Sequence, residues 1–121
     1  MQIVRVLSRQ CVLIISALCG LFILPVLAEI VDVKYHRPVD LKPFVCTDTK
    51  SSFVNRVCYD QTEKYMLILL NTTWYHYCEI GAGTVSSLIM ASSVGSYYNA
   101  NIKGSGKDGP FDCRTHRVPN Y

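Results

Sequence analysis

Three segments in the middle of the chain alternate between apolar and polar positions, and this pattern predicts a small antiparallel sheet. Residues 53–59, 65–70 and 74–79 are rich in β-branched and aromatic side chains, which favour strands. Polar residues 60–64 form the first predicted turn, and residues 71–73 form a second, tighter one. Because sequential strands joined by short turns usually pair with each other, the three segments predict a β-meander.

A helix is predicted after the third strand, because the spacing of apolar residues changes there. Val85 and Leu88 share one face at helical spacing, and Thr84 is a suitable N-cap residue. Gly95 suits a C-terminal cap, and a short second helix is predicted from Ser96. The predicted fold class is therefore α+β, a three-stranded antiparallel β-meander packed on one helix plus a short helical turn.

Both faces of the predicted sheet are apolar. Side chains alternate along a strand, so one face carries Val57, Tyr59, Tyr65, Leu67, Leu69, Tyr75 and Tyr77. The opposite face carries Val54, Cys58, Met66, Ile68, Leu70, Trp74 and Cys78. An apolar face of this size needs a cover. The only candidates within the chain are the extensions at residues 29–51 and 104–121.

The beginning of the chain has the pattern of a secretory signal peptide. Arg5 and Arg9 precede a mostly apolar run that closes with the small residue Ala28. We expect cleavage after Ala28, a periplasmic or secreted protein, and no stable membrane span after cleavage. An uncleaved membrane anchor is the alternative. The predicted organisation is a signal peptide at 1–28, an N-terminal extension at 29–51, a domain at 52–103, and a C-terminal tail at 104–121 that covers the sheet.

Removal of the signal peptide changes the charge and the cysteine count. Residues 29–121 hold ten Lys and Arg against nine Asp and Glu, a net charge of +1. A near-neutral chain gives no electrostatic argument for nucleic acid as a partner, because affinity for phosphates grows with the cations engaged. Four cysteines remain, namely Cys46, Cys58, Cys78 and Cys113. An even number in a small exported domain predicts two disulfides.

The predicted strand order limits how these cysteines pair. Cys58 and Cys78 lie on the two outer strands of the meander, about 10 Å apart, whereas a disulfide requires Cα atoms within about 7 Å. Each of them should therefore pair with a cysteine of an extension. We favour Cys46–Cys58 with Cys78–Cys113, because residues 51–52 allow Cys46 to fold back over Cys58. The alternative is Cys46–Cys78 with Cys58–Cys113.

Two stretches of the chain resemble the KTSC domain, a small module named after the C-terminus of some lysyl-tRNA synthetases. They are Tyr75-His76-Tyr77 on the third predicted strand and Ala-Ser-Ser-Val-Gly-Ser-Tyr-Tyr-Asn at residues 91–99. The resemblance extends from Ser52 to Lys103, and with the signal sequence it describes an exported single-domain member. It implies a fold in which the helix covers the face of Tyr75 and Tyr77, and no established activity.

Signatures of catalysis and metal binding are weak. The chain has no Gly-x-Ser-x-Gly motif, and its acidic residues are scattered singly, so nothing places a nucleophile beside a base. We expect no enzyme and no cofactor. A tetrahedral zinc site could combine His76-x-Cys78 with Cys113-x-x-His116. The disulfide interpretation is favoured over that site, and no metal is expected.

The leading prediction for function is an exported, non-catalytic binding module that recognises a protein or an envelope component. A small periplasmic enzyme is the alternative, and a nucleic-acid-binding module is third. Aromatic side chains on one strand face can stack unpaired bases, but export and near-neutral charge disfavour RNA. The candidate binding residues are Tyr75, Tyr77, Tyr97, Asn99 and Lys103.

Overall fold

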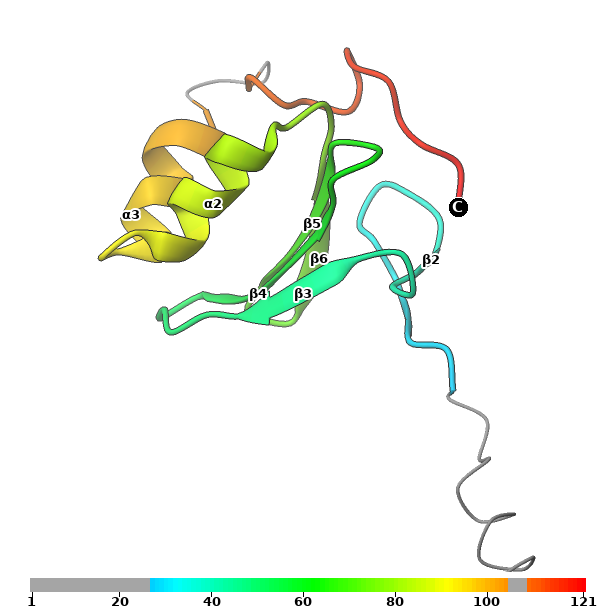
Figure 1. Ribbon diagram of the computed structural model, residues 1–121, viewed down its shortest axis with the longest axis horizontal. Coiled ribbons are helices and arrows are strands. Elements are labelled where there is room, and N and C mark those ends of the chain that lie inside the picture. Colours follow the sequence, from blue (N-terminus) through cyan, green and yellow to red (C-terminus); the bar gives the residue numbers. More distant parts are fainter. Residues whose placement is uncertain (1–26, 105–108) are drawn as a thin grey trace, which may run out of the picture.

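The computed structural model describes residues 27–104 and 109–121. The predicted signal peptide lies outside these residues except for Leu27 and Ala28. One sheet separates two layers, with the helices on one side and the N-terminal segment and the C-terminal tail on the other (Figure 1). None of the helices in the described part of the chain has the length and hydropathy that a membrane span requires.

Four antiparallel strands form the main sheet, in the order β3-β4-β5-β6. They are β3 (Val45–Asp48), β4 (Val54–Asp60), β5 (Tyr65–Leu70) and β6 (Thr73–Tyr77). A separate two-stranded ladder joins β1 (Ile30–Val31) to β2 (Val39–Asp40).

The predicted three-stranded meander is therefore wrong as a description of the fold. Its strands correspond to β4, β5 and β6, but the described residues hold six strands in two sheets. The additional edge strand β3 comes from the N-terminal extension and is not among the predicted strands. It pairs with β4 so that Cys46 lies directly opposite Cys58, and a disulfide joins the two.

The helical layer also differs from the predicted single helix with one helical turn. It contains α2 (Ala82–Met90), α3 (Val94–Tyr97) and a five-residue π-helical turn, η1 (Tyr98–Ile102). Helix α2 begins after Gly81, which has an extended backbone and occupies the N-cap position expected for Thr84. Helix α3 is capped by Ser93, whose side-chain oxygen accepts a hydrogen bond from the Ser96 N–H at 3.3 Å.

Gly95 lies inside α3 and does not end a helix. A Cβ atom at this position would lie 2.6 Å from Cε1 of Phe53 and 3.3 Å from Oγ of Ser51. The residue is buried, so the absence of a side chain allows α3 to approach the start of β4 closely. Packing against Phe53 therefore explains why the sequence motif at residues 91–99 contains a glycine.

Strand β5 faces the opposite way from the prediction. In the register, Ile68 lies opposite Tyr75, and Met66 lies opposite Tyr77, so these side chains share the face that the helices cover. Because side chains alternate along a strand, a shift of one residue moves every side chain to the other face. The residues predicted for the uncovered face but found in the helix-side core are Val54, Met66, Ile68 and Leu70. Tyr65 and Leu67, predicted beneath the helix, are found in the opposite core.

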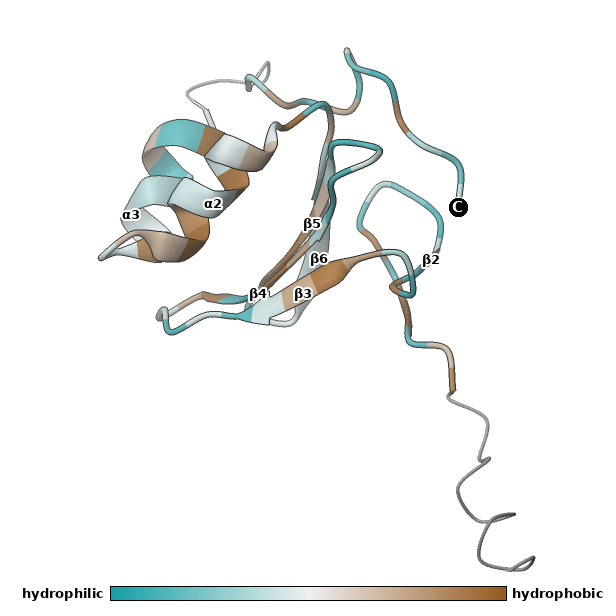
Figure 2. Cartoon of the chain, in the orientation of Figure 1, coloured by the Kyte–Doolittle hydropathy of each residue, from teal (hydrophilic) through white to brown (hydrophobic). Residues whose placement is uncertain are grey.

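The helix-side core packs β4, β5 and β6 against the helices. Apolar residues cover the side of α2 that faces the sheet (Figure 2). The buried members contributed by the helical layer and the loop before it are Ile80, Val85, Leu88, Val94, Tyr98 and Ile102.

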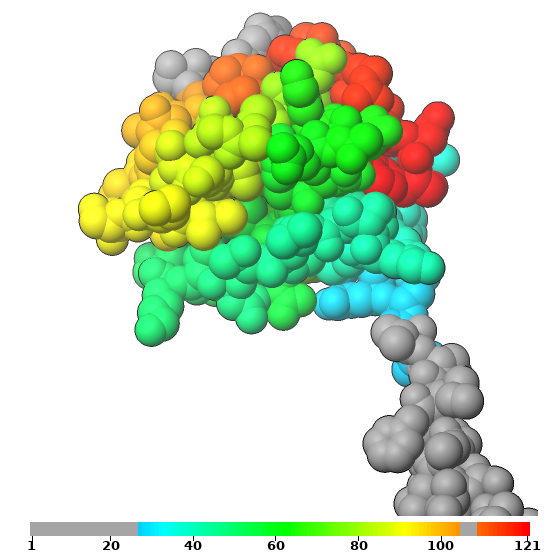
Figure 3. Space-filling model, in the orientation of Figure 1, coloured from blue at the N-terminus to red at the C-terminus, as the bar shows by residue number. Residues whose placement is uncertain are grey.

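A second core fills the opposite face of the sheet. It is covered mainly by the N-terminal extension, whose buried members are Val31, Val33, Val39, Leu41 and Phe44. In the space-filling view the tail, in red, packs against the green strands, and the N-terminal segment, in blue and cyan, lies below them (Figure 3). The ring of Tyr121 stacks on Tyr65 with ring centroids 5.6 Å apart, and its hydroxyl donates to Asp60 at 2.8 Å.

Two disulfides hold the extensions to the sheet, in the pairing that we favour from the sequence. Cys46 is joined to Cys58, and Cys78 is joined to Cys113. The second bond lies just beyond the end of β6, where the Cys78 N–H also donates to the carbonyl oxygen of Phe111 at 2.9 Å. The tail is therefore fixed to β6 by a covalent bond and a backbone hydrogen bond. Two disulfides are compatible with an exported protein.

Candidate functional site

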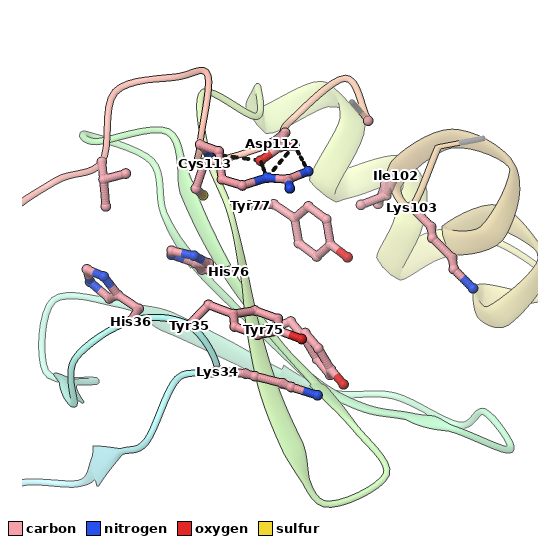
Figure 4. A pocket seen from close by; sticks show the side chains of 13 residues that line it. Lys34, Tyr35, His36, Tyr75, His76, Tyr77, Ile102, Lys103, Asp112 and Cys113 are labelled. Atoms are coloured by element: carbon pink, nitrogen blue, oxygen red, sulfur yellow. Dashed lines mark hydrogen bonds and ion pairs between the residues drawn. The ribbon is translucent and has the colours of Figure 1, made fainter. Parts of the chain in front are cut away.

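A slot of about 580 Å³ opens along the outer edge of β6. Its walls come from residues 34–36 of the N-terminal segment and 112–114 of the tail, and residues 75–77 of β6 form its floor. Lys103, at the end of the helical layer, lies beside it (Figure 4). The slot therefore exists only because both extensions are fixed next to this edge strand.

Along this edge, the backbone of β6 has a position, His76, that is unpaired among the described residues. The carbonyl oxygen of Trp74 accepts a hydrogen bond from the Lys34 N–H, and the Cys78 N–H donates to Phe111, both at 2.9 Å. Outward-facing backbone groups recur every second residue in an edge strand, so those of His76 also face outward. Among the described residues neither group has a hydrogen-bond partner. The floor of the slot therefore offers one free donor and one free acceptor.

The side chain of His76 lies on the other side of β6 from the two tyrosines of that strand (Figure 4). Its Nδ1 is 2.8 Å from the hydroxyl oxygen of Tyr65, and its ring stacks on His36 with centroids 4.9 Å apart. The pKa of His76 is lowered to about 4, mainly by burial and also by the charge of a protonated His36, while Asp112 acts in the opposite direction. The imidazole is therefore neutral near pH 7.

The tyrosines of β6 lie on the helical side of the floor. The hydroxyl oxygens of Tyr77 and Tyr98 are 2.5 Å apart, and burial raises the pKa of both hydroxyls. The ammonium group of Lys34 lies 5.6 Å from the ring centre of Tyr75 and 5.2 Å from that of Tyr35. These distances are within the range of cation–π attraction, so the lysine is held at the mouth of the slot.

Cations outnumber anions among the described residues that line the slot. The lining contains three cationic residues, Lys34, Lys103 and Arg114, and one carboxylate, that of Asp112. Arg114 Nη2 lies 2.7 Å from Asp112 Oδ2, and its hydrogen bonds hold the pKa of Asp112 at about 2. Because this ion pair is neutral as a whole, Lys34 and Lys103 determine the positive sign of the site.

The structure places three of the five predicted binding residues, Tyr75, Tyr77 and Lys103, in the slot. The others lie elsewhere. Tyr97 is half-buried against the helix-side core. Asn99 is exposed at a second, polar hollow of about 340 Å³ between residues 50–53 and 92–96.

Sequence reasoning missed the contributions of Lys34, Asp112, Arg114 and the His76 backbone. The first three lie in extensions without periodic pattern, so their position depends on tertiary contacts. One signal was available for the tail, because pairing Cys113 with Cys78 places its neighbours beside β6.

The zinc alternative brings together three of its four expected ligands. The candidate ligand atoms of His76, Cys78 and Cys113 all lie within 4.8 Å of one another. The two cysteines form a disulfide, so their sulfurs do not act as thiolate ligands in this state. His116 is outside the group, and its Nδ1 lies 2.8 Å from the carbonyl oxygen of Asp112.

A family model for the KTSC domain, a domain of unknown function, matches residues 50–105. The match begins in the loop before β4 and ends three residues beyond η1, and it supports the resemblance that we draw from the sequence. No curated protein matches the chain. The matched segment supplies β6 and Lys103, whereas both walls at residues 34–36 and 112–114 lie outside it. The slot therefore combines the domain with segments added to it.

Proposed function

We propose that this protein is an exported, non-catalytic binding module whose slot holds a short, extended, acidic segment of a partner protein. The observation that carries the proposal is the unpaired backbone of His76 at the floor of the slot. An extended segment lying along β6 would pair with this N–H and C=O as an added strand does. The two tethered walls limit such pairing to a few residues.

Charge supports an acidic partner. Lys34 and Lys103 give the lining its positive sign. The neighbouring hydroxyls of Tyr35 and Tyr75 raise the pKa of Lys34, so this lysine stays charged over the physiological range. Two backbone hydrogen bonds, each contributing about 0.5–1.5 kcal/mol net, and two exposed cations, each contributing up to about 1 kcal/mol, support a dissociation constant of roughly millimolar size. The site therefore suits reversible recognition.

The enzyme alternative has one observation in its favour, because a shifted pKa in a cleft is a common property of active sites. That group is His76, whose pKa of about 4 makes it a weak base near pH 7. Its Nδ1 is already engaged by Tyr65, and Cys78 and Cys113 are joined to each other. The geometry therefore favours binding over acid–base or nucleophilic chemistry.

An NMR titration tests this proposal. The probe is a library of capped pentapeptides in which Glu alternates with a varied residue, added to ¹⁵N-labelled protein. We expect members of the library to shift the His76 amide resonance and those of its neighbours in β6. The same library with Lys in place of Glu should shift them at least about tenfold more weakly, because the site is positive.

Paired lysine variants provide the matched control. Replacement of Lys34 and Lys103 by Ala should weaken binding of the acidic peptides by about tenfold or more. The same replacement of Lys42 and Lys50, which are exposed and outside the slot, should leave it unchanged. Shifts confined to the second hollow or to β3, or equal binding of acidic and basic peptides, would contradict the proposal. So would a library without any binding member.

A further inference from the structure

Within residues 27–104 and 109–121, the Cys78–Cys113 disulfide lies beside an imidazole, and the Cys46–Cys58 disulfide does not. The ligand atoms of His76, Cys78 and Cys113 lie within 4.8 Å of one another, with Cys78 buried and the other two partly buried. Among the described residues no such group includes Cys46 or Cys58. The two disulfides therefore differ in what their sulfurs would meet after reduction.

The histidine of this group is already oriented by a second residue. Nδ1 of His76 is 2.8 Å from the Tyr65 hydroxyl oxygen, and Tyr65 is fully buried. A histidine that binds a metal through one nitrogen usually donates its other N–H to such a partner, which fixes the ring and the tautomer. With Nδ1 held by Tyr65, Nε2 is the nitrogen available to a metal ion.

We propose that reduction of Cys78–Cys113 creates a site for a thiophilic divalent metal ion such as Zn²⁺, with His76, Cys78 and Cys113 as ligands. Two thiolates and one imidazole are a common zinc ligand set, and the fourth tetrahedral position is left for water. Tetrahedral coordination at ordinary Zn–S distances places the two sulfurs about 3.8 Å apart. The reduced side chains therefore need only a small separation to bind the ion.

The chemistry balances with a dithiol as the reductant. Two electrons pass to the disulfide, the bond between the sulfurs of Cys78 and Cys113 breaks, and each sulfur takes a proton. The dithiol is oxidised to its own disulfide. Binding of the metal ion then releases both thiol protons to solvent, because thiolates are the ligands. In the metal-bound state the ion replaces the covalent bond between β6 and the tail, and the wall at residues 112–114 stays in place.

Cobalt binding tests the site by a spectroscopic readout. The protein is reduced with dithiothreitol, freed of it under anaerobic conditions and titrated with Co²⁺. We expect a thiolate-to-cobalt charge-transfer band that saturates at one ion per chain and is bleached by Zn²⁺. One equivalent of Zn²⁺ should raise the melting midpoint of the reduced protein by about 4 °C or more and leave the oxidised protein unchanged.

Variants locate the ligands. The double variant Cys46→Ser/Cys58→Ser should keep the band, and Cys78→Ser/Cys113→Ser should lose it. His76→Asn should weaken affinity at least about tenfold, whereas His116→Asn should not change it. Equal affinity in the His76→Asn variant, or a band that follows Cys46 and Cys58, would overturn the proposal.

The test remains decisive if reduction unfolds the protein. In that case, one equivalent of Zn²⁺ should restore the native near-ultraviolet circular dichroism, because metal binding and folding are coupled. A reduced protein that stays unfolded with Zn²⁺, or one that stays folded without a charge-transfer band, would also overturn the proposal.

Discussion

At the scale of single residues, His76 links the slot to the core. Its backbone faces outward between the two walls, and its ring lies between Tyr65 and His36 on the opposite side of the sheet from the helices. A change in the protonation of this ring therefore affects packing directly beneath the site. This arrangement makes His76 the residue through which pH should act on the fold.

We predict that acid destabilises the protein through His76. Its pKa is about 4 in the folded protein, against about 6.5 in an unfolded chain. The neutral ring of His76 therefore stabilises the folded state fully above pH 6.5, and this stabilisation is lost as the pH falls through 4. After allowance for partial exposure, this loss is about 1–2 kcal/mol. Urea unfolding between pH 4 and 7.5 should show this decrease in the wild type.

The matched comparison uses two histidine variants. In His76→Gln the part of the pH dependence that comes from this group should disappear, whereas His116→Gln should retain it. The nearby groups that face the ring, His36 and Asp112, are kept in both variants. Identical pH profiles for the wild type and His76→Gln would contradict the assignment.

Gly95 gives a second prediction at this scale. Gly95→Ala would place a methyl group 2.6 Å from the Phe53 ring and should lower the free energy of unfolding by about 1–3 kcal/mol. Gly83→Ala, inside α2 with no atom within 4 Å of the new Cβ, should instead raise it by about 0.5–1 kcal/mol. Denaturant unfolding measures both, and a neutral Gly95→Ala would show that α3 can move away from Phe53.

At the scale of elements, the positions of the central strands could be predicted from sequence, whereas their orientation could not. The predicted segments at 53–59, 65–70 and 74–79 lie within two residues of β4, β5 and β6 at either end. In β5, however, every residue from Tyr65 to Leu70 is apolar or aromatic. Alternation then gives no information about which side faces the helices, and a register irregularity between Val54 and Arg56 in β4 shifts the pairing further.

Strand β3 and the start of α2 were missed for a different reason. Residues 45–48 are mostly exposed in the structure, so they lack the buried alternation that marks a strand in sequence. Their strand conformation depends on pairing with β4 and on the disulfide between Cys46 and Cys58. Likewise α2 begins after Gly81 without a side-chain cap, and the polar cap signal at Thr84 is misleading.

The two disulfides should differ in their contribution to stability. Their sequence separations are 12 for Cys46–Cys58 and 35 for Cys78–Cys113. Loop-closure entropy in the unfolded chain then gives about 3 kcal/mol for the shorter loop and about 4 kcal/mol for the longer one. We therefore expect Cys78→Ser/Cys113→Ser to lower the urea midpoint more than Cys46→Ser/Cys58→Ser. The reverse order would show that strand β3 depends more on the Cys46–Cys58 disulfide than the tail depends on Cys78–Cys113.

At the scale of the whole molecule, a single sheet separates two cores. The domain matched by the KTSC family model supplies the sheet from β4 to β6 and the helical layer, and the extensions supply the cover of the second core and both walls of the slot. That an apolar sheet face needs a cover could be predicted from sequence. The slot could not be predicted, because its position depends on the tertiary contacts that two irregular segments make beside β6.

Amide hydrogen exchange of the ligand-free protein tests the central claim, that β6 has an open backbone position in the slot. The His76 amide should exchange quickly because its N–H faces outward and has no partner in the part of the chain that the structure describes. The Cys78 amide, bonded to Phe111 at 2.9 Å, and the Tyr77 amide, which faces β5, should be strongly protected. Protection of His76 equal to that of Tyr77 would show a paired edge and would contradict the proposed site.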